Sequence, residues 1–165
     1  MRSVEDAHLW SLTKASSTEM TLVHNNRIDV NFKLAQSGLI QASTIKCRRS
    51  ALDNDGVCAF VTSALQDTIR GAAMKPTEAI RLISAAFCAQ RHLRAECDAL
   101  SSFFPTQLIR DEEGAITIQA TVLLSERRAK LQVLAPCKKE ALLSASAQLF
   151  RPEDVQVELV YGAVE

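Results

Sequence analysis

The fold is decided by the stretch IDVNFKL at residues 28–34, in which apolar residues alternate with polar ones. Alternation with a period of two is typical of a β-strand that buries one face and exposes the other. A second and longer alternating stretch, ITIQATVLL, stands at residues 116–124. Each stretch therefore predicts a strand of a small sheet with one buried face.

Shorter strand patterns surround both stretches. Two hairpins are expected over residues 9–48, with Asn25-Asn26 as a tight turn, because asparagine tolerates the left-handed backbone conformation that such turns need. The further strands expected around the second stretch are residues 107–110, 129–134 and 155–161.

Helical patterns separate these strands. Apolar residues recur at helical spacing through residues 57–71, and the preceding Asp53–Gly56 offers a carboxylate as N-cap. A longer helix is predicted over residues 77–104, where Pro105 stops it. A short helix is also expected over residues 138–148.

The order of the elements is sheet, helix, helix, sheet, so the same pattern occurs twice and the second copy is nearly reversed. This order favours an α+β fold of two small domains, each an antiparallel sheet packed on helices, over a barrel or a doubly wound nucleotide fold. We expect an N-terminal domain over residues 1–74 and a C-terminal domain over residues 75–165.

Composition excludes several classes of protein. The 19 basic residues balance 19 acidic ones, so the chain lacks the basic surplus that nucleic-acid binding normally shows. No apolar run reaches the length of a membrane span, and Met1-Arg2-Ser3 does not open a signal peptide. We therefore expect no direct contact with nucleic acid and none with a membrane.

The five cysteines are spread along the chain without a C-x-x-C pair. A disulfide framework or a four-ligand zinc site would have closer, paired spacing. Cys58, Cys88 and Cys97 fall on apolar helical stripes, where a thiol behaves as a small hydrophobic side chain. We expect a reducing compartment and no metal site.

No complete catalytic constellation is present. His8, His24 and His92 are the only histidines, and the sequence has neither a G-x-S-x-G nucleophile motif nor a glycine-rich phosphate loop. Asp53–Gly56 resembles the start of a calcium loop, but Thr62 stands where the bidentate glutamate belongs. The sequence predicts no enzyme, no cofactor and no metal, and favours a docking module.

The residues also resemble a known family. The runs LWSL (9–12) and STEMTLVHNNRI (17–28) are similar to the start of the globular C-terminal region of the blinkin-type outer-kinetochore scaffold. Further similarities are the helix over residues 80–104 that runs into Phe-Pro, the basic turn ERRAKL (126–131) and the closing VQVELVYG (155–162). The chain resembles a fungal-like member of that family over most of its length.

This resemblance implies two tandem RWD domains that stand after a long coiled coil, which is absent here and would bind a partner of its own. It implies a location in the nucleus, at the kinetochore on the centromere of the chromosome. There the module would anchor the scaffold to the centromere-side MIND complex by binding the tail of one MIND subunit. Chromosome segregation and spindle-checkpoint signalling in mitosis would depend on this anchor. A standard RWD domain also has a leading and a closing helix, which the pattern of the two halves lacks.

A candidate docking groove follows from the first strands and the first helix. A partner peptide can add to an exposed sheet edge through backbone hydrogen bonds, while alternate side chains enter pockets between sheet and helix. The candidate residues are Trp10, Leu12, Met20, Leu22, Val61 and Leu65. The same residues also fit the core of the first domain, and Trp10 in particular fits a core anchor.

Two other functions are open at this point. The chain fits an RWD interaction module of another kinetochore protein or of a ubiquitin-pathway protein, which would have the same fold and a different partner. A small α+β enzyme or ligand-binding domain fits less well, because it would need His24 or His92 beside a thiol in a cleft.

Overall fold

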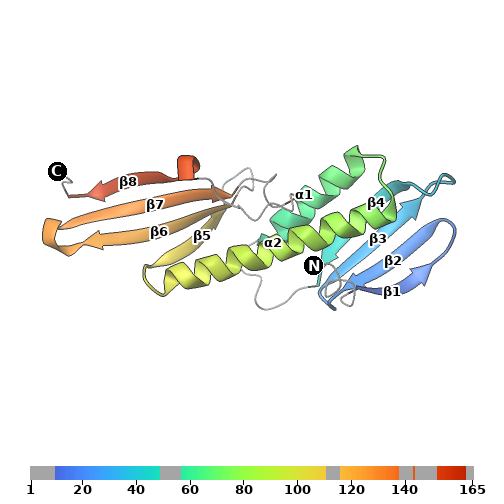
Figure 1. Cartoon of the computed structure of the whole chain (residues 1–165), viewed down its shortest axis with the longest axis horizontal. Coiled ribbons are helices and arrows are strands. Elements are labelled where there is room, and N and C mark those ends of the chain that lie inside the picture. The colour runs from blue at the N-terminus through green and yellow to red at the C-terminus, as the bar shows by residue number, and fades with distance from the viewer. Residues whose placement is uncertain (1–9, 49–56, 111–115, 138–142, 144–151, 163–165) are drawn as a thin grey trace. The chain divides into compact units, whose positions relative to one another are not determined.

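The two alternating stretches form central strands of two antiparallel sheets in a computed structural model of the protein. The structure describes residues 10–48, 57–110, 116–137, 143 and 152–162. Within these residues it contains eight strands and two α-helices, so the predicted α+β class is confirmed (Figure 1).

The first sheet is an antiparallel meander with the strand order β1-β2-β3-β4. Its strands are β1 (Trp10–Ala15), β2 (Glu19–His24), β3 (Ile28–Leu34) and β4 (Ile40–Cys47). Val30 lies opposite Leu22 on one neighbour and opposite Ile45 on the other, and all three side chains are buried. The predicted one-sided burial of this sheet is therefore confirmed along β3.

The turn between β2 and β3 also has the predicted conformation. Asn25 and Asn26 have φ angles of 48° and 54°, which lie in the left-handed region that asparagine tolerates. Behind them the backbone N–H of Arg27 donates a hydrogen bond to the carbonyl of His24 at 3.0 Å. The two asparagines therefore set the register in which β3 returns along β2.

Helix α1 (Val57–Gly71) has the predicted bounds and contacts β4 (Figure 1). Gln66 fixes this contact, because its side-chain amide donates to the carbonyl of Ile45 at 3.1 Å. The helix buries a continuous apolar stripe of Val57, Cys58, Phe60, Val61, Ala64, Leu65 and Ile69. This stripe supplies one part of the cover for the apolar face of the first sheet.

Helix α2 (Pro76–Ser101) ends three residues earlier than predicted. The amides of Phe103 and Phe104 both donate to the carbonyl of Leu100, which closes the helix in a turn. Pro105 explains the early end, because a proline disfavours helical backbone in the residue before it. The two phenylalanines of this turn keep much of their side chains at the surface, since Phe104 is 39% exposed and Phe103 is 80% exposed.

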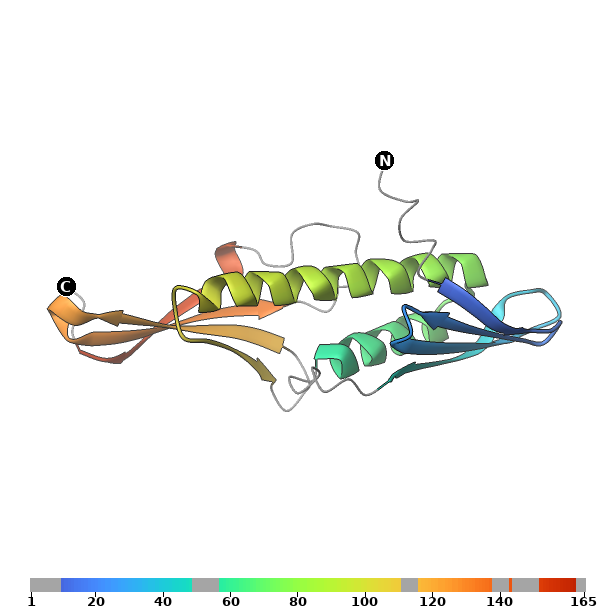
Figure 2. The ribbon, with the colours of Figure 1, turned by 90° about the horizontal axis from the view of Figure 1, so that it is seen from below.

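The second sheet is also an antiparallel meander, with the strand order β5-β6-β7-β8 (Figure 2). Its strands are β5 (Thr106–Arg110), β6 (Ile116–Leu124), β7 (Ala129–Cys137) and β8 (Gln156–Tyr161). Ile116, Ile118 and Ala120 are buried on one face of β6. Strand β6 thus buries one face, as the alternation at residues 116–124 predicts.

By their contacts, the residues divide into two compact units, residues 1–87 and 88–165, and the division lies inside α2. The predicted boundary after residue 74 and the identification of both units as RWD-like stay predictions. The expected cap at Asp53–Gly56 lies outside the described residues. So does the helix expected over residues 138–148, except at Leu143, whose backbone is helical.

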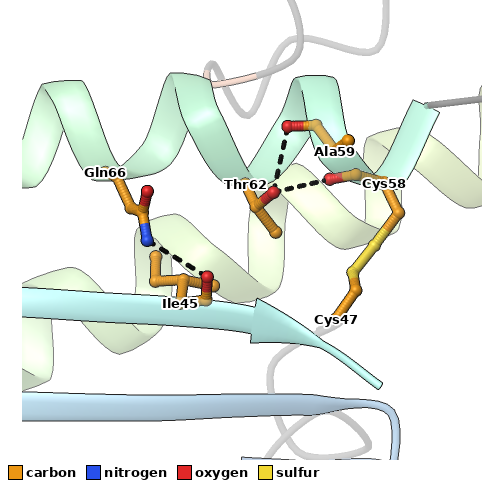
Figure 3. Close-up of a disulfide and its surroundings, with 6 residues drawn as sticks. All are labelled: Ile45, Cys47, Cys58, Ala59, Thr62 and Gln66. Carbon is orange, nitrogen blue, oxygen red and sulfur yellow. Dashed lines mark hydrogen bonds between the residues drawn. A yellow bond between two sulfur atoms is a disulfide. The ribbon is translucent and has the colours of Figure 1, made fainter. Parts of the chain in front are cut away.

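Cys47 and Cys58 form a disulfide between the end of β4 and the first turn of α1 (Figure 3). The cysteine spacing did not predict this bond, and Cys58 is a bonded half-cystine where a small hydrophobic side chain was expected. Cys47 lies opposite Ile28 and so shares the side of β4 that α1 covers, which brings the two Cα atoms to 6.7 Å. That separation lies within the range that disulfides span.

Truncation of the first core should be costly. We expect Phe32→Ala to lower the free energy of unfolding by about 3–5 kcal/mol, because the ring is fully buried and the cavity would relax only in part. Urea unfolding followed by circular dichroism measures the change. Lys33→Ala, on the exposed side of the same strand, should change the free energy of unfolding by less than about 0.5 kcal/mol. Equal effects of the two variants would contradict the observed burial.

The disulfide should contribute measurably to stability. Reductant should lower the free energy of unfolding by about 2–4 kcal/mol, since the bond restricts the unfolded chain between β4 and α1. A Cys47→Ala/Cys58→Ala variant should have the stability of the reduced wild-type protein, and reductant should not change it. A wild-type unfolding curve that reductant leaves in place would show that the bond does not contribute.

Candidate partner-binding site

Strand β1 is an edge of the first sheet and pairs, among the described strands, with β2 alone (Figure 1). No described strand pairs with the backbone groups on its other side, which is the arrangement that an added strand requires. A bulge at Thr13 interrupts the pairing between Leu12 and Lys14. The regular part of the edge is consequently short and runs from Trp10 to Leu12.

Trp10 is half-buried at the start of this edge. Its indole N–H donates to the hydroxyl of Ser84 on α2 at 2.9 Å. Its ring centroid lies 4.7 Å from that of His24, which in turn lies 6.2 Å from Phe87 on α2. Trp10 therefore anchors the edge of the sheet to α2, as the core-anchor interpretation expects, and keeps part of its ring at the surface.

Leu12 lies next along the same face of β1. The register places Leu12 opposite Leu22, so the two side chains point to the same face of the sheet. Leu22 is only 6% exposed, whereas Leu12 is 57% exposed. An apolar side chain thus stands at the margin of the buried face, on the outermost strand.

The other candidate residues do not join Trp10 and Leu12 at the surface. Met20 is half-buried on β2, and Val61 and Leu65 are fully buried on α1. The predicted groove placed residues 57–69 beside β1 and β2. In the structure α1 packs against β4, at the opposite edge of the sheet, and α2 provides the contact with Trp10.

The role of α2 was missed because the sequence pattern gives the apolar stripe of a helix but not the strand that the stripe covers. Ser84 and Phe87 lie about one turn apart on α2, and nothing in their spacing indicates that Ser84 contacts Trp10, 74 positions away in the sequence. Only the register of β1 on β2 brings Trp10 beside His24 and within reach of α2.

Charged and polar side chains occupy the far end of β1. The Lys14 ammonium and the Asn31 amide both hydrogen-bond the carboxylate of Glu19, and these bonds lower the pKa of Glu19. The Lys14 ammonium is thereby held beside the Glu19 carboxylate. Paired charges of this kind protect a sheet edge from unwanted pairing, so Trp10–Leu12 is the more accessible part of β1.

The two described histidines, His24 and His92, have different surroundings. His24 is buried between the rings of Trp10 and Phe87, and His92 is exposed one turn beyond Cys88 on α2. Burial raises the pKa of the Cys137 thiol to about 11, with a smaller contribution from Cys97, so Cys137 stays protonated and poorly nucleophilic at neutral pH.

No protein-family model and no curated protein matches the chain. No helix within the described ranges is long and apolar enough to cross a membrane. The same residues contain no group of three or more side chains placed to hold a metal ion.

Because Leu12 is exposed and Leu22 is buried, the same substitution should have a small effect on stability at Leu12 and a large effect at Leu22. Leu22→Asp should lower the free energy of unfolding by about 3 kcal/mol or more, because it removes a buried leucine and buries an unpaired carboxylate. Leu12→Asp should change it by less than about 1 kcal/mol, since the new carboxylate remains in water. Thermal and urea unfolding of the two variants measure the contrast, and similar losses would place Leu12 in the core.

Proposed function

We propose that the chain is a non-enzymatic docking module that binds an extended segment of a partner protein along β1. The observation that carries this proposal is the exposed Leu12 beside Trp10, on the outermost strand and on the same face as the buried Leu22. An added strand would hydrogen-bond the open side of β1 and cover Leu12 with its own apolar side chains. The burial of about one leucine side chain favours such binding by roughly 1.5–3 kcal/mol.

We further propose that the partner is the tail of a MIND subunit, as the resemblance to the blinkin-type scaffold implies. The chain would then anchor the outer-kinetochore scaffold to the centromere and so support chromosome segregation and checkpoint signalling. Two units, each with a four-stranded antiparallel sheet and helical segments, are compatible with the tandem RWD-like domains of that family. This compatibility supports the proposal at the level of architecture.

An RWD module of another kinetochore complex or of the ubiquitin pathway is the alternative that the same site allows. It would use the same edge of the first sheet and differ only in the peptide that it selects. A pull-down against a panel of purified kinetochore complexes separates the two proposals, because each predicts a different retained complex.

The direct experiment is calorimetric titration of the whole chain with recombinant MIND complex, repeated with the tail of each subunit deleted in turn. We expect binding to the intact complex and its loss on deletion of a single tail. Binding that survives every deletion would show that the partner segment is not a tail. Absence of binding to intact MIND, with retention of another complex in the panel, would favour the alternative.

Leu12→Asp tests the site itself. We expect at least about a tenfold loss of affinity for MIND, because the carboxylate would be desolvated under the added strand. The matched control is Leu123→Asp on β6, a similarly exposed leucine (63%) in the other unit, which should bind as the wild type does. Wild-type affinity of Leu12→Asp would exclude β1 as the binding edge.

A further inference from the structure

The free edge of the second sheet has a different character from that of the first. β8 is the last strand of its sheet and pairs, within the described part of the chain, with β7 alone. All six of its residues are exposed, among them Val157 at 62% and Leu159 at 49%. Such exposure of apolar residues on an outermost strand indicates a surface that another chain can cover.

The exposed residues continue the buried apolar face of the sheet. Val157 lies opposite Val133, and Leu159 lies opposite Leu131. Val133 is in turn opposite Ala120, which is buried on β6. The apolar face therefore runs from the core outward and ends, uncovered, at β8.

Two features define the C-terminal end of β8. A bulge at Val160 separates the pair Leu159–Leu131 from the pair Tyr161–Lys130, so the straight part of the edge is residues 156–159. Gly162 follows with φ 95°, and a Cβ there would lie 2.6 Å from the Cα of Ala129. Only glycine permits this close approach to the start of β7, which fixes that end of the strand.

The edge is acidic. Residues 152–162 contain Glu153, Asp154 and Glu158 and no lysine or arginine. Glu158 lies between Val157 and Leu159 and points to the opposite face, opposite Gln132. A strand that adds here would therefore place apolar residues beside Val157 and Leu159 and most favourably a basic residue beside Glu158.

We propose that the β8 edge binds a second extended segment in which apolar and basic residues alternate. Its apolar side chains would extend the face formed by Val157 and Leu159, and a lysine or arginine would lie directly across from Glu158. Cross-strand pairs of opposite charge stabilise such pairing, whereas like charges destabilise it. This site lies in the other unit from β1 and does not depend on the function proposed for β1.

A second copy of the chain fits this edge less well. Two β8 strands related by a two-fold axis must pair residues that point to the same face. When the two-fold axis passes through residue 158, Glu158 of one copy lies directly across from Glu158 of the other, and this pair of like charges is repulsive. The register centred on Leu159 runs into the bulge at Val160, and the one centred on Val157 extends no further than Val155 before the turn Pro152–Asp154 begins.

The test uses three short synthetic peptides with the whole chain: one alternates valine and lysine, one alternates valine and glutamate, and one is the first peptide N-methylated at alternate amides. We expect the valine–lysine peptide to bind and to shift the amide NMR signals of residues 156–159. The acidic and the N-methylated peptides should each bind at least about tenfold more weakly, because they lose the charge pair and the backbone hydrogen bonds respectively. Equal binding of all three peptides, or no binding of the first, would overturn the proposal.

Matched variants locate the site. Glu158→Lys should weaken the valine–lysine peptide at least about tenfold and favour the acidic one. Glu126→Lys, an exposed glutamate in the 3-10 turn Ser125–Arg127, makes the same change in net charge and should leave both affinities unchanged. Equal effects of the two variants, or NMR shifts that cluster away from β8, would contradict the proposal. So would self-association in sedimentation that Leu159→Asp abolishes, which would identify a second copy as the occupant.

Discussion

The architecture depends on one constraint, which is that the central strand β3 or β6 of each sheet has an apolar face that must be removed from water. In the first sheet Leu22, Val30, Phe32 and Ile45 form that face, and helices α1 and α2 cover it from the side of β4 and the side of β1 respectively. Hydrophobic burial is the dominant favourable contribution to folding, so the placement of the helices follows from the placement of these residues. What the helices leave uncovered determines where a partner can bind.

The sequence predicts the parts of the fold that depend on local pattern. The alternation in residues 28–34 and 116–124 identifies the central strands, because a period of two can bury only one face. Asn25-Asn26 identifies the first tight turn for an equally local reason. By contrast, the disulfide and the contact between Trp10 and Ser84 join residues that are brought together by strand register and helix packing, and no local pattern encodes either of them.

The candidate site was predictable only in part for the same reason. Leu12 and Leu22 have the same residue type and belong to neighbouring strands, yet Leu12 is exposed on the outermost strand and Leu22 is buried on an inner one. Val61 and Leu65 were assigned to the groove because they lie on an apolar stripe, and that stripe packs into the core beside β4. An apolar pattern shows which residues can be buried, whereas exposure depends on what lies above them.

The bond between Cys47 and Cys58 also has a mechanical consequence. Tension applied to the ends of the chain would pass through the two sulfur atoms and bypass residues 48–57, so this stretch could not lengthen while the bond is intact. The Cα atoms of the two cysteines are 6.7 Å apart, and their sequence separation is 11 residues. A chain segment of that length can extend to about 36–40 Å. Reduction of the bond would therefore add about 30 Å of slack between the first sheet and its helix under load.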